Sequence, residues 1–169
     1  MASSSARPSG WAKSAQPSAP PTKPTDGSTS ETVAPRTQVT QKPVRLEGTS
    51  QFSSTMTATV SDASSRTVKA KYPGEVSGAS VLFTVTIKNT SRREVDLNAL
   101  VVNVLDDEEA PANQITSPPA SDMPHVVAPG RTARGRYVFV VPKGSRNPIT
   151  IEASVSAEEP VLVFRGPVG

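Results

Sequence analysis

His125 is the only histidine in this 169-residue chain, so it is the only candidate for an imidazole base or ligand. A general base needs a nucleophile and an orienting carboxylate within hydrogen-bonding reach. Ser121 and Asp122 lie close to His125 in sequence, but no pattern brings the three groups together. A hydrolase is therefore one hypothesis, and an exposed or edge histidine is the favoured interpretation of His125.

Four consecutive acidic residues at 106–109 offer oxygen ligands to a hard cation. Calcium requires about six to eight oxygens that converge from a shaped loop, and an acidic run does not by itself supply that shape. We therefore expect residues 106–109 to form a solvated turn between two strands, and we predict no metal site.

Three arginines form the first-ranked candidate for a ligand or partner surface: Arg131, Arg134 and Arg136. In an extended strand, residues two apart share a face, so Arg134 and Arg136 point the same way and could meet carboxylate or phosphate groups. Arg92 and Arg93 could join them. The alternative is a solvated sheet face on which these arginines pair across strands with acidic residues such as Glu152.

Other chemistry is poorly supported. The chain has no cysteine, which excludes disulfides and thiolate metal sites. Glycine-rich phosphate loops, the Gly-x-Ser-x-Gly elbow and the His-Glu-x-x-His motif are all missing from the sequence. Aromatic residues make up 4%, too few for the stacking rows that hold single-stranded nucleic acid. We predict no catalytic residue, no cofactor and no nucleic-acid partner.

Composition divides the chain near residue 50. Residues 1–50 contain nine Ser, seven Thr, seven Pro and six Ala, and such a segment buries too little apolar surface to offset the entropy of ordering it. They also carry six Lys or Arg against three Asp or Glu, which accounts for the whole formal charge of +3. We predict a disordered tail or stalk over 1–50 that acts as a spacer or is weakly attracted to an anionic surface. Trp11 within it is either a docking anchor or a chance occurrence.

Residues 51–169 show the alternation of apolar and polar side chains that is typical of β-strands. In the clearest case, Val81, Phe83, Val85 and Ile87 share one face. Similar patterns predict strands at 56–60, 100–105, 133–141, 149–155 and 161–165, and a weaker one at 67–72. Residues 117–124 and 128–130 are expected to be loop and turn.

The predicted fold is therefore all-β. About seven to eight short strands fit an antiparallel, immunoglobulin-like β-sandwich over residues 51–169, with a small barrel as the rival architecture.

Several segments carry a family resemblance: the strand that ends in Asn89-Thr90, the turn Val127-Ala128-Pro129-Gly130, the stretch 135–142 and the final strand at 160–166. The chain resembles, over about residues 66–167, the immunoglobulin-like domain of unknown function of exported or membrane-tethered actinobacterial proteins, a group related to the immunoprotective extracellular antigens of mycobacteria. The resemblance implies an extracytoplasmic setting and no established activity, and it provides no catalytic residues.

Such domains usually follow a signal peptide, a lipid-modified cysteine or a single membrane helix. This sequence shows no export signal in its first thirty residues and no apolar run long enough to span a membrane. The expectation is thus an extracellular or envelope-associated protein whose export signal lies upstream of Met1, or alternatively a cytoplasmic one.

The function predicted from these observations is a non-enzymatic interaction or spacer module on a flexible stalk, with an unidentified protein or envelope partner. The alternative is a soluble carrier or sensor of a small ligand, which would use the basic sheet face or a pocket between the sheets.

Overall fold

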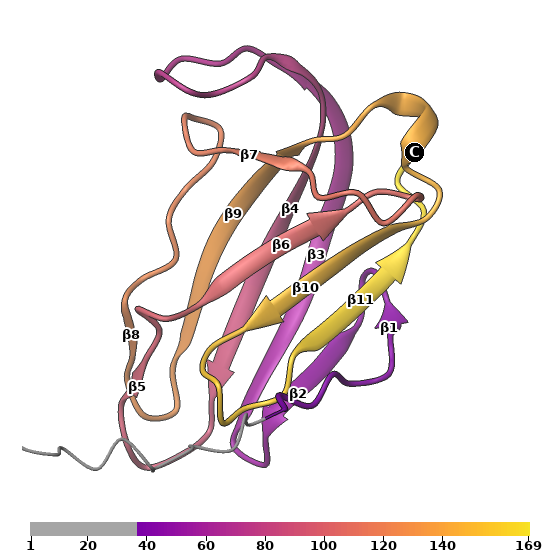
Figure 1. Cartoon of the computed structure of the whole chain (residues 1–169). Helices are drawn as coiled ribbons and strands as arrows, with labels where there is room; N and C mark the ends of the chain where they lie inside the picture. The colour runs from indigo at the N-terminus through magenta and orange to yellow at the C-terminus, as the bar shows by residue number, and fades with distance from the viewer. Residues whose placement is uncertain (1–36) are drawn as a thin grey trace, which may run out of the picture. The chain divides into compact units, whose positions relative to one another are not determined.

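A computed structural model describes residues 37–169 and shows that they fold into two facing β-sheets, as predicted (Figure 1). Residues 1–36, which include Trp11 and most of the predicted tail, lie outside the described residues. No helix in the described part is long and apolar enough to cross a membrane.

The first sheet has four strands, in the spatial order β1 (Val44–Arg45), β11 (Leu162–Gly166), β10 (Ile149–Ser154) and β6 (Val101–Leu105). The second sheet has five, in the order β2 (Thr49–Ser53), β3 (Met56–Val68), β4 (Gly78–Asn89), β9 (Thr132–Val140) and β7 (Asn113–Ile115). A small ribbon pairs β5 (Val95–Asp96) with β8 (Val126–Val127), and one 3-10 turn, η1 (Lys143–Ser145), follows β9. Every pairing between named strands is antiparallel except that of β1 with β11.

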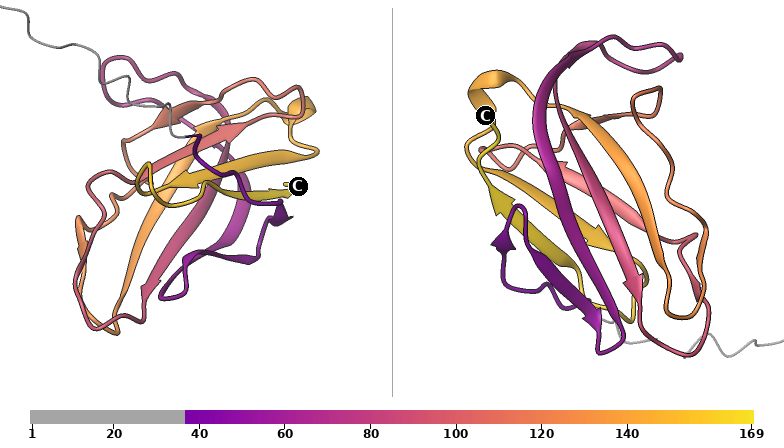
Figure 2. Two further views of the ribbon diagram at one scale, coloured as in Figure 1. Left: turned by 60° about the horizontal axis from the view of Figure 1, so that its bottom comes forward. Right: turned by 180° about the vertical axis from the view of Figure 1, so that it is seen from behind.

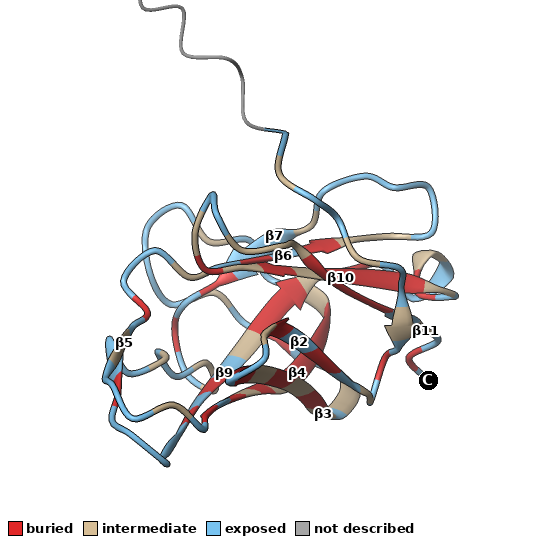
Figure 3. Cartoon of the chain, turned by 90° about the horizontal axis from the view of Figure 1, so that it is seen from below, coloured by how far each residue is buried: buried red, intermediate tan, exposed pale blue. Residues whose placement is uncertain are grey.

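The core lies between the two sheets, and buried side chains alternate with more exposed ones along strands such as the first half of β3 and β6 (Figure 3). Phe83 of β4 is fully buried, and its ring stacks on those of Tyr137 and Phe139 in β9 at centroid distances of 5.9 and 6.0 Å. Ile151 of β10 and Phe164 of β11, also fully buried, belong to the same core. Each such side chain stabilises the fold by roughly 1.5–3 kcal/mol relative to its exposed state.

Residue 51 is too late a start for the folded domain. Within the segment predicted as tail, Val44 pairs with Phe164 of the last strand, and β2 begins at Thr49. Leu46 is 6% exposed and belongs to the core. The error arose because the partner of β1 lies over 100 residues away in sequence, so composition alone gave no sign of the pairing.

The predicted separate strand at 67–72 is also wrong in its bounds. Residues 67 and 68 are the end of β3, and residues 69–77 form the loop that leads into β4. A β-bulge at Asp62 and Ala63 shifts the register of β3 against β4 and interrupts the alternation in sequence. One long strand therefore looked like two short ones.

The strands predicted at 81–88, 100–105, 133–141, 149–155 and 161–165 agree with β4, β6, β9, β10 and β11 to within a few residues. The described residues contain eleven strands rather than about seven or eight, because pairs as short as β5 and β8 leave no periodic signal. The predicted turn at 128–130 is present: Gly130 has a φ of +67°, and the amide of Arg131 donates to the carbonyl of Ala128 at 3.1 Å.

Asn89 closes the end of β4. It is fully buried, and its Nδ2 donates to the carbonyl oxygens of Arg93 at 2.7 Å and Val127 at 3.0 Å, while its Oδ1 accepts from the amide of Ser91 at 2.9 Å. The same side chain therefore ends one strand, shapes the turn that follows and holds β8 in place.

Candidate functional site

A groove runs over the outer face of the five-stranded sheet, the face turned away from the core. Figure 2 shows this sheet from behind, with β3, β4 and β9 side by side. Two adjoining hollows of about 340 and 200 Å³ make up the groove, and they share Asp62, Thr84 and Arg136. We call this surface the outer groove; its lining residues are Asp62, Ser64, Arg66, Leu82, Thr84, Pro119, Ser121, Arg134, Gly135 and Arg136.

The two arginines of β9 lie where the sequence placed them. Arg134 and Arg136 are exposed on the outer face, opposite Thr86 and Thr84 of β4. No carboxylate forms an ion pair with either arginine within residues 37–169. Both guanidinium groups are therefore available to a ligand.

The predicted third arginine does not belong to the groove. Arg131 lies in the turn before β9, where its carbonyl accepts from the amide of Asn89 at 3.0 Å. Arg92 and Arg93 lie in the turn after β4 and do not line the groove either. Glu152, suggested as a pairing partner, is on β10 in the opposite sheet, so cross-strand pairing with Arg134 or Arg136 is excluded.

Asp62 supplies the one carboxylate in the lining of the groove, and the bulge of β3 places it there. Its φ of 56° lies in the left-handed region, which aspartate tolerates better than most residues. The hydroxyl of Ser61 donates to its Oδ2 at 3.0 Å. With Arg66, Arg134 and Arg136 around it, the groove carries three formal positive charges and one negative charge.

One wall of the groove is an arch formed by residues 116–120. The chain leaves the sheet after Ile115, which pairs with Val138, and returns at Ser121, whose amide and carbonyl both bond to Arg136 at 2.9 Å. Beneath the arch, Leu82 and Val138 form part of a second, smaller apolar cluster on the outer face. The arch was correctly predicted as loop, but its position over the sheet was not.

Glu75 holds the arch to the loop between β3 and β4. Its carboxylate accepts from the amide and hydroxyl of Ser117, at 2.7 Å each, from both groups of Thr116, and from the amides of Lys71 and Tyr72. Partial desolvation raises the pKa of Glu75, but these hydrogen bonds outweigh it and hold the pKa well below its ordinary value. The sequence gave no indication of this contact, because Glu75 and Ser117 are far apart in the chain.

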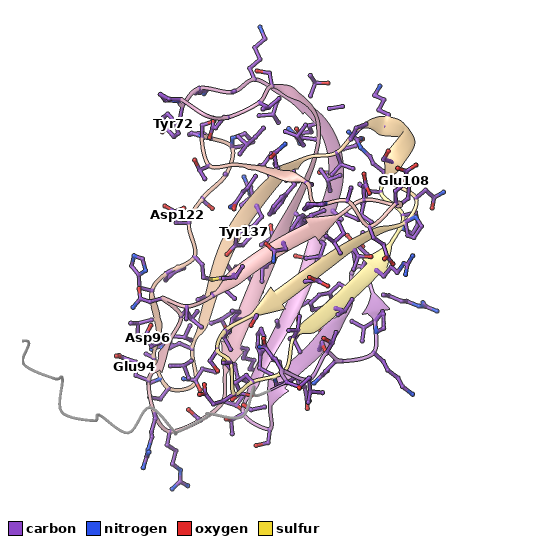
Figure 4. The ribbon with its side chains drawn as sticks, in the orientation of Figure 1. Tyr72, Glu94, Asp96, Glu108, Asp122 and Tyr137 are labelled. Atoms are coloured by element: carbon purple, nitrogen blue, oxygen red, sulfur yellow. The ribbon has the colours of Figure 1, made fainter. Side chains whose placement is uncertain are left out.

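Tyr137 packs on the inner side of β9, behind the groove. Figure 4 labels its side chain and that of Asp122, which lies in the loop beside β9. Burial, with a smaller contribution from the negative charge of Asp122, raises the pKa of the Tyr137 phenol to about 12. Next to it, Gly135 permits a close approach, since a Cβ there would lie 3.0 Å from the amide nitrogen of Met123.

The remaining candidates lie elsewhere. Asp106 uses its Oδ1 to accept from the amides of Glu108 and Ala110, so residues 106–109 form a turn after β6 as predicted. His125 is exposed just before β8, and within the described residues its ring shares no hydrogen bond with Ser121 or Asp122. These groups do not converge with the outer groove.

Comparisons with known proteins agree on the fold. Residues 45–160 match the family described as "Domain of unknown function (DUF4352)". The chain is similar in structure to the yjhA protein from Bacillus subtilis, at 12% identity and a TM-score of 0.59, over 72% of this chain and 97% of that one. It is also similar to a functionally unknown protein from Listeria monocytogenes EGD-e, at 15% identity and a TM-score of 0.53, over 72% and 82%. No match was found among curated proteins.

These comparisons confirm the coarse part of the family resemblance, a β-sandwich domain of unknown function. At such low sequence identity, the similarity to the two solved structures shows a shared fold and nothing about function. The relation to actinobacterial proteins and mycobacterial antigens stays a prediction.

Proposed function

This chain belongs to the DUF4352 family of domains of unknown function, and we propose that its β-sandwich is a non-enzymatic interaction module that binds an acidic segment of a partner protein in the outer groove. The observation that carries the proposal is the pair of exposed guanidinium groups, Arg134 and Arg136, which line the groove without an ion-pair partner in the described residues.

The chemistry of the groove favours carboxylates. A guanidinium group presents its donors in a planar fork that matches a carboxylate in two parallel hydrogen bonds. Arg134 and Arg136 are two residues apart on one strand, so side chains of an extended segment that alternate in the same way could reach both. The excess of positive charge in the groove would attract such a segment.

A non-enzymatic role is supported by the scattered positions of the reactive groups. The His125 ring, the acidic turn at 106–109 and the groove arginines belong to separate parts of the described structure. A general base would need a nucleophile and an orienting acid beside it, and His125 has neither as a hydrogen-bond partner among residues 37–169.

We further propose that the module works outside the cytoplasm, with the segment that precedes β1 contributing a stalk. The family resemblance and the Ser-, Thr-, Pro- and Ala-rich composition support this setting. Fractionation of cells that express the native gene tests it: recovery in the envelope or the medium would agree, and recovery with cytoplasmic markers alone would contradict it.

A carrier or sensor of small anions is the second candidate function. The larger hollow, at about 340 Å³, falls at the lower end of the range of small-molecule sites, roughly 300–1,000 Å³. The groove, rather than the space between the sheets, is the favoured location, because the side chains that face each other across the sandwich are closely packed and buried.

Affinity capture with the full chain tests the interaction directly. We expect the wild-type protein to retain a partner from an envelope extract, and added salt to weaken the retention. The double variant R134Q/R136Q should lose most of it, whereas R92Q/R93Q, which removes the same two charges outside the groove, should not. Equal capture by R134Q/R136Q and wild type would overturn the proposal, and retention of only a dialysable anion would favour the carrier.

A further inference from the structure

A second basic hollow, separate from the outer groove, lies between β3 and the η1 turn. Its volume is about 190 Å³, and its lining consists of Ser65, Arg66, Thr67, Lys143 and Arg146. Only Arg66 is shared with the outer groove. We call this surface the η1 hollow.

Arg146 is the unusual member of this set, because it is buried. The residue is 4% exposed, and its Nε and Nη2 both donate to the carbonyl oxygen of Val141, at 3.0 and 2.9 Å. These two bonds fix the plane of the guanidinium group. Nη1 takes part in neither, so one end of the group is left for another acceptor.

The charge of Arg146 has no counterpart within residues 37–169, since no carboxylate lies within ion-pair distance of it. Desolvation by burial lowers its pKa, although an arginine remains protonated at neutral pH. A buried charge is costly unless it is paired. A carbonyl oxygen satisfies two of its donors but cannot neutralise it.

The other side chains of the η1 hollow also favour an anion. Together with Arg146, the lining provides three cations and two hydroxyl groups, and it includes no carboxylate. The acidic turn at 106–109 touches the η1 turn through the amide of Asp107, which donates to the carbonyl of Ser145 at 3.3 Å. No acidic side chain of that turn forms an ion pair with Lys143 or Arg146.

From this arrangement we propose that the η1 hollow binds a phosphate group, with Arg146 as its buried anchor and Arg66, Lys143 and the hydroxyls of Ser65 and Thr67 as further donors. Phosphate suits the site because its several oxygens can accept hydrogen bonds from different directions, and because arginine binds it through paired donors. The hollow is also far larger than the space that one water needs, about 10–15 Å³, so there is room for a phosphate ester.

Nuclear magnetic resonance titration of the full chain tests the proposal, with inorganic phosphate added at constant ionic strength against chloride. We expect saturable shifts of the amide signals of residues 65–67 and 143–146. Lys143→Gln should weaken the affinity for phosphate about threefold to tenfold, as expected for the loss of one charge-assisted contact. Lys88→Gln removes the same charge from an exposed site on β4 outside the hollow and should leave the affinity unchanged.

Further variants address folding and the source of the phosphate. Thr67→Val removes one hydroxyl at an exposed position and should weaken binding without unfolding the domain, whereas replacement of Arg146 could unfold it. Glycerol phosphate distinguishes the sources, because tighter binding than inorganic phosphate indicates a phosphate carried on a larger molecule and equal binding indicates the free ion. Shifts that do not saturate, or equal affinities in Lys143→Gln and Lys88→Gln, would overturn the proposal.

Discussion

Replacement of Asn89 by alanine should destabilise the domain strongly, although the change removes only one small amide. The wild-type side chain lies at a fully buried position, where it forms one longer hydrogen bond of 3.4 Å to the carbonyl oxygen of Ala128 and three short hydrogen bonds of 2.7, 3.0 and 2.9 Å. Each contributes roughly 0.5–1.5 kcal/mol, and its loss leaves a backbone group of Arg93, Val127 or Ser91 without that partner. We therefore expect Asn89→Ala to lower the free energy of unfolding by about 2–4 kcal/mol.

Urea unfolding followed by circular dichroism measures this difference, and thermal unfolding should show a midpoint about 10 °C lower. Asn98→Ala is the matched control: Asn98 is exposed, and its side chain forms no hydrogen bond within the described residues, so its effect should stay within about 0.5 kcal/mol. A loss below about 1 kcal/mol for Asn89→Ala would show that the three bonds do not carry the stability assigned to them.

Asn89→Asp separates hydrogen bonding from shape. The introduced carboxylate could still accept from Ser91, but its second oxygen would face the carbonyls of Arg93 and Val127, to which Nδ2 donates in the wild type. Only the protonated acid could donate there, so the folded state would favour protonation and raise the pKa of the new group. The variant should therefore lose stability, relative to wild type, as the pH rises above about 4. A difference that does not depend on pH would refute this reasoning.

Three further predictions concern the surroundings of the outer groove. Glu75→Gln should speed amide hydrogen exchange in residues 69–77 and 116–120, and exchange that is identical in both proteins would show that Glu75 does not hold the arch. In the wild type the depressed pKa of Glu75 contributes stability above pH 4.5, the ordinary pKa of the group, and this stability is lost as the pH falls below that value. Gly135→Ala should cost about 1–3 kcal/mol in urea unfolding, because the new Cβ meets the backbone of Met123 at 3.0–3.1 Å, and an unchanged midpoint would show that this segment yields freely. The phenol of Tyr137 should ionise near pH 12 in an ultraviolet titration, and a Tyr137→Phe variant should lack that transition; a phenol that titrates near pH 10 would mean that water reaches the ring.

The local pattern of the sequence was sufficient for the strands and their faces. Phe83, Val85 and Ile87 point into the core, and Arg134 and Arg136 point out, as alternation predicted. This succeeded because side chains in a strand alternate with period two whatever the strand pairs with. The same rule found the arginine pair that lines the outer groove, but it could not show that Arg131 falls outside it.

Short-range pattern fails where a side chain acts on a distant part of the chain. Glu75 holds the arch through Thr116 and Ser117, and Val44 pairs with Phe164. The type of each residue does not indicate which distant residue it will contact. The bulge at Asp62 was hidden for a related reason, since it broke the alternation on which the prediction relied.

The sequence by itself thus determined an all-β chain with a buried and a solvated side to each long strand, because those properties depend on neighbours one and two residues away. Only the tertiary structure decided that Asp62 and the arch make a groove around Arg134 and Arg136, and that Arg146 is buried without a countercharge in the described residues. The physical reason is that burial, hydrogen-bond partners and cavities arise when segments far apart in the chain pack together, which sequence spacing does not encode.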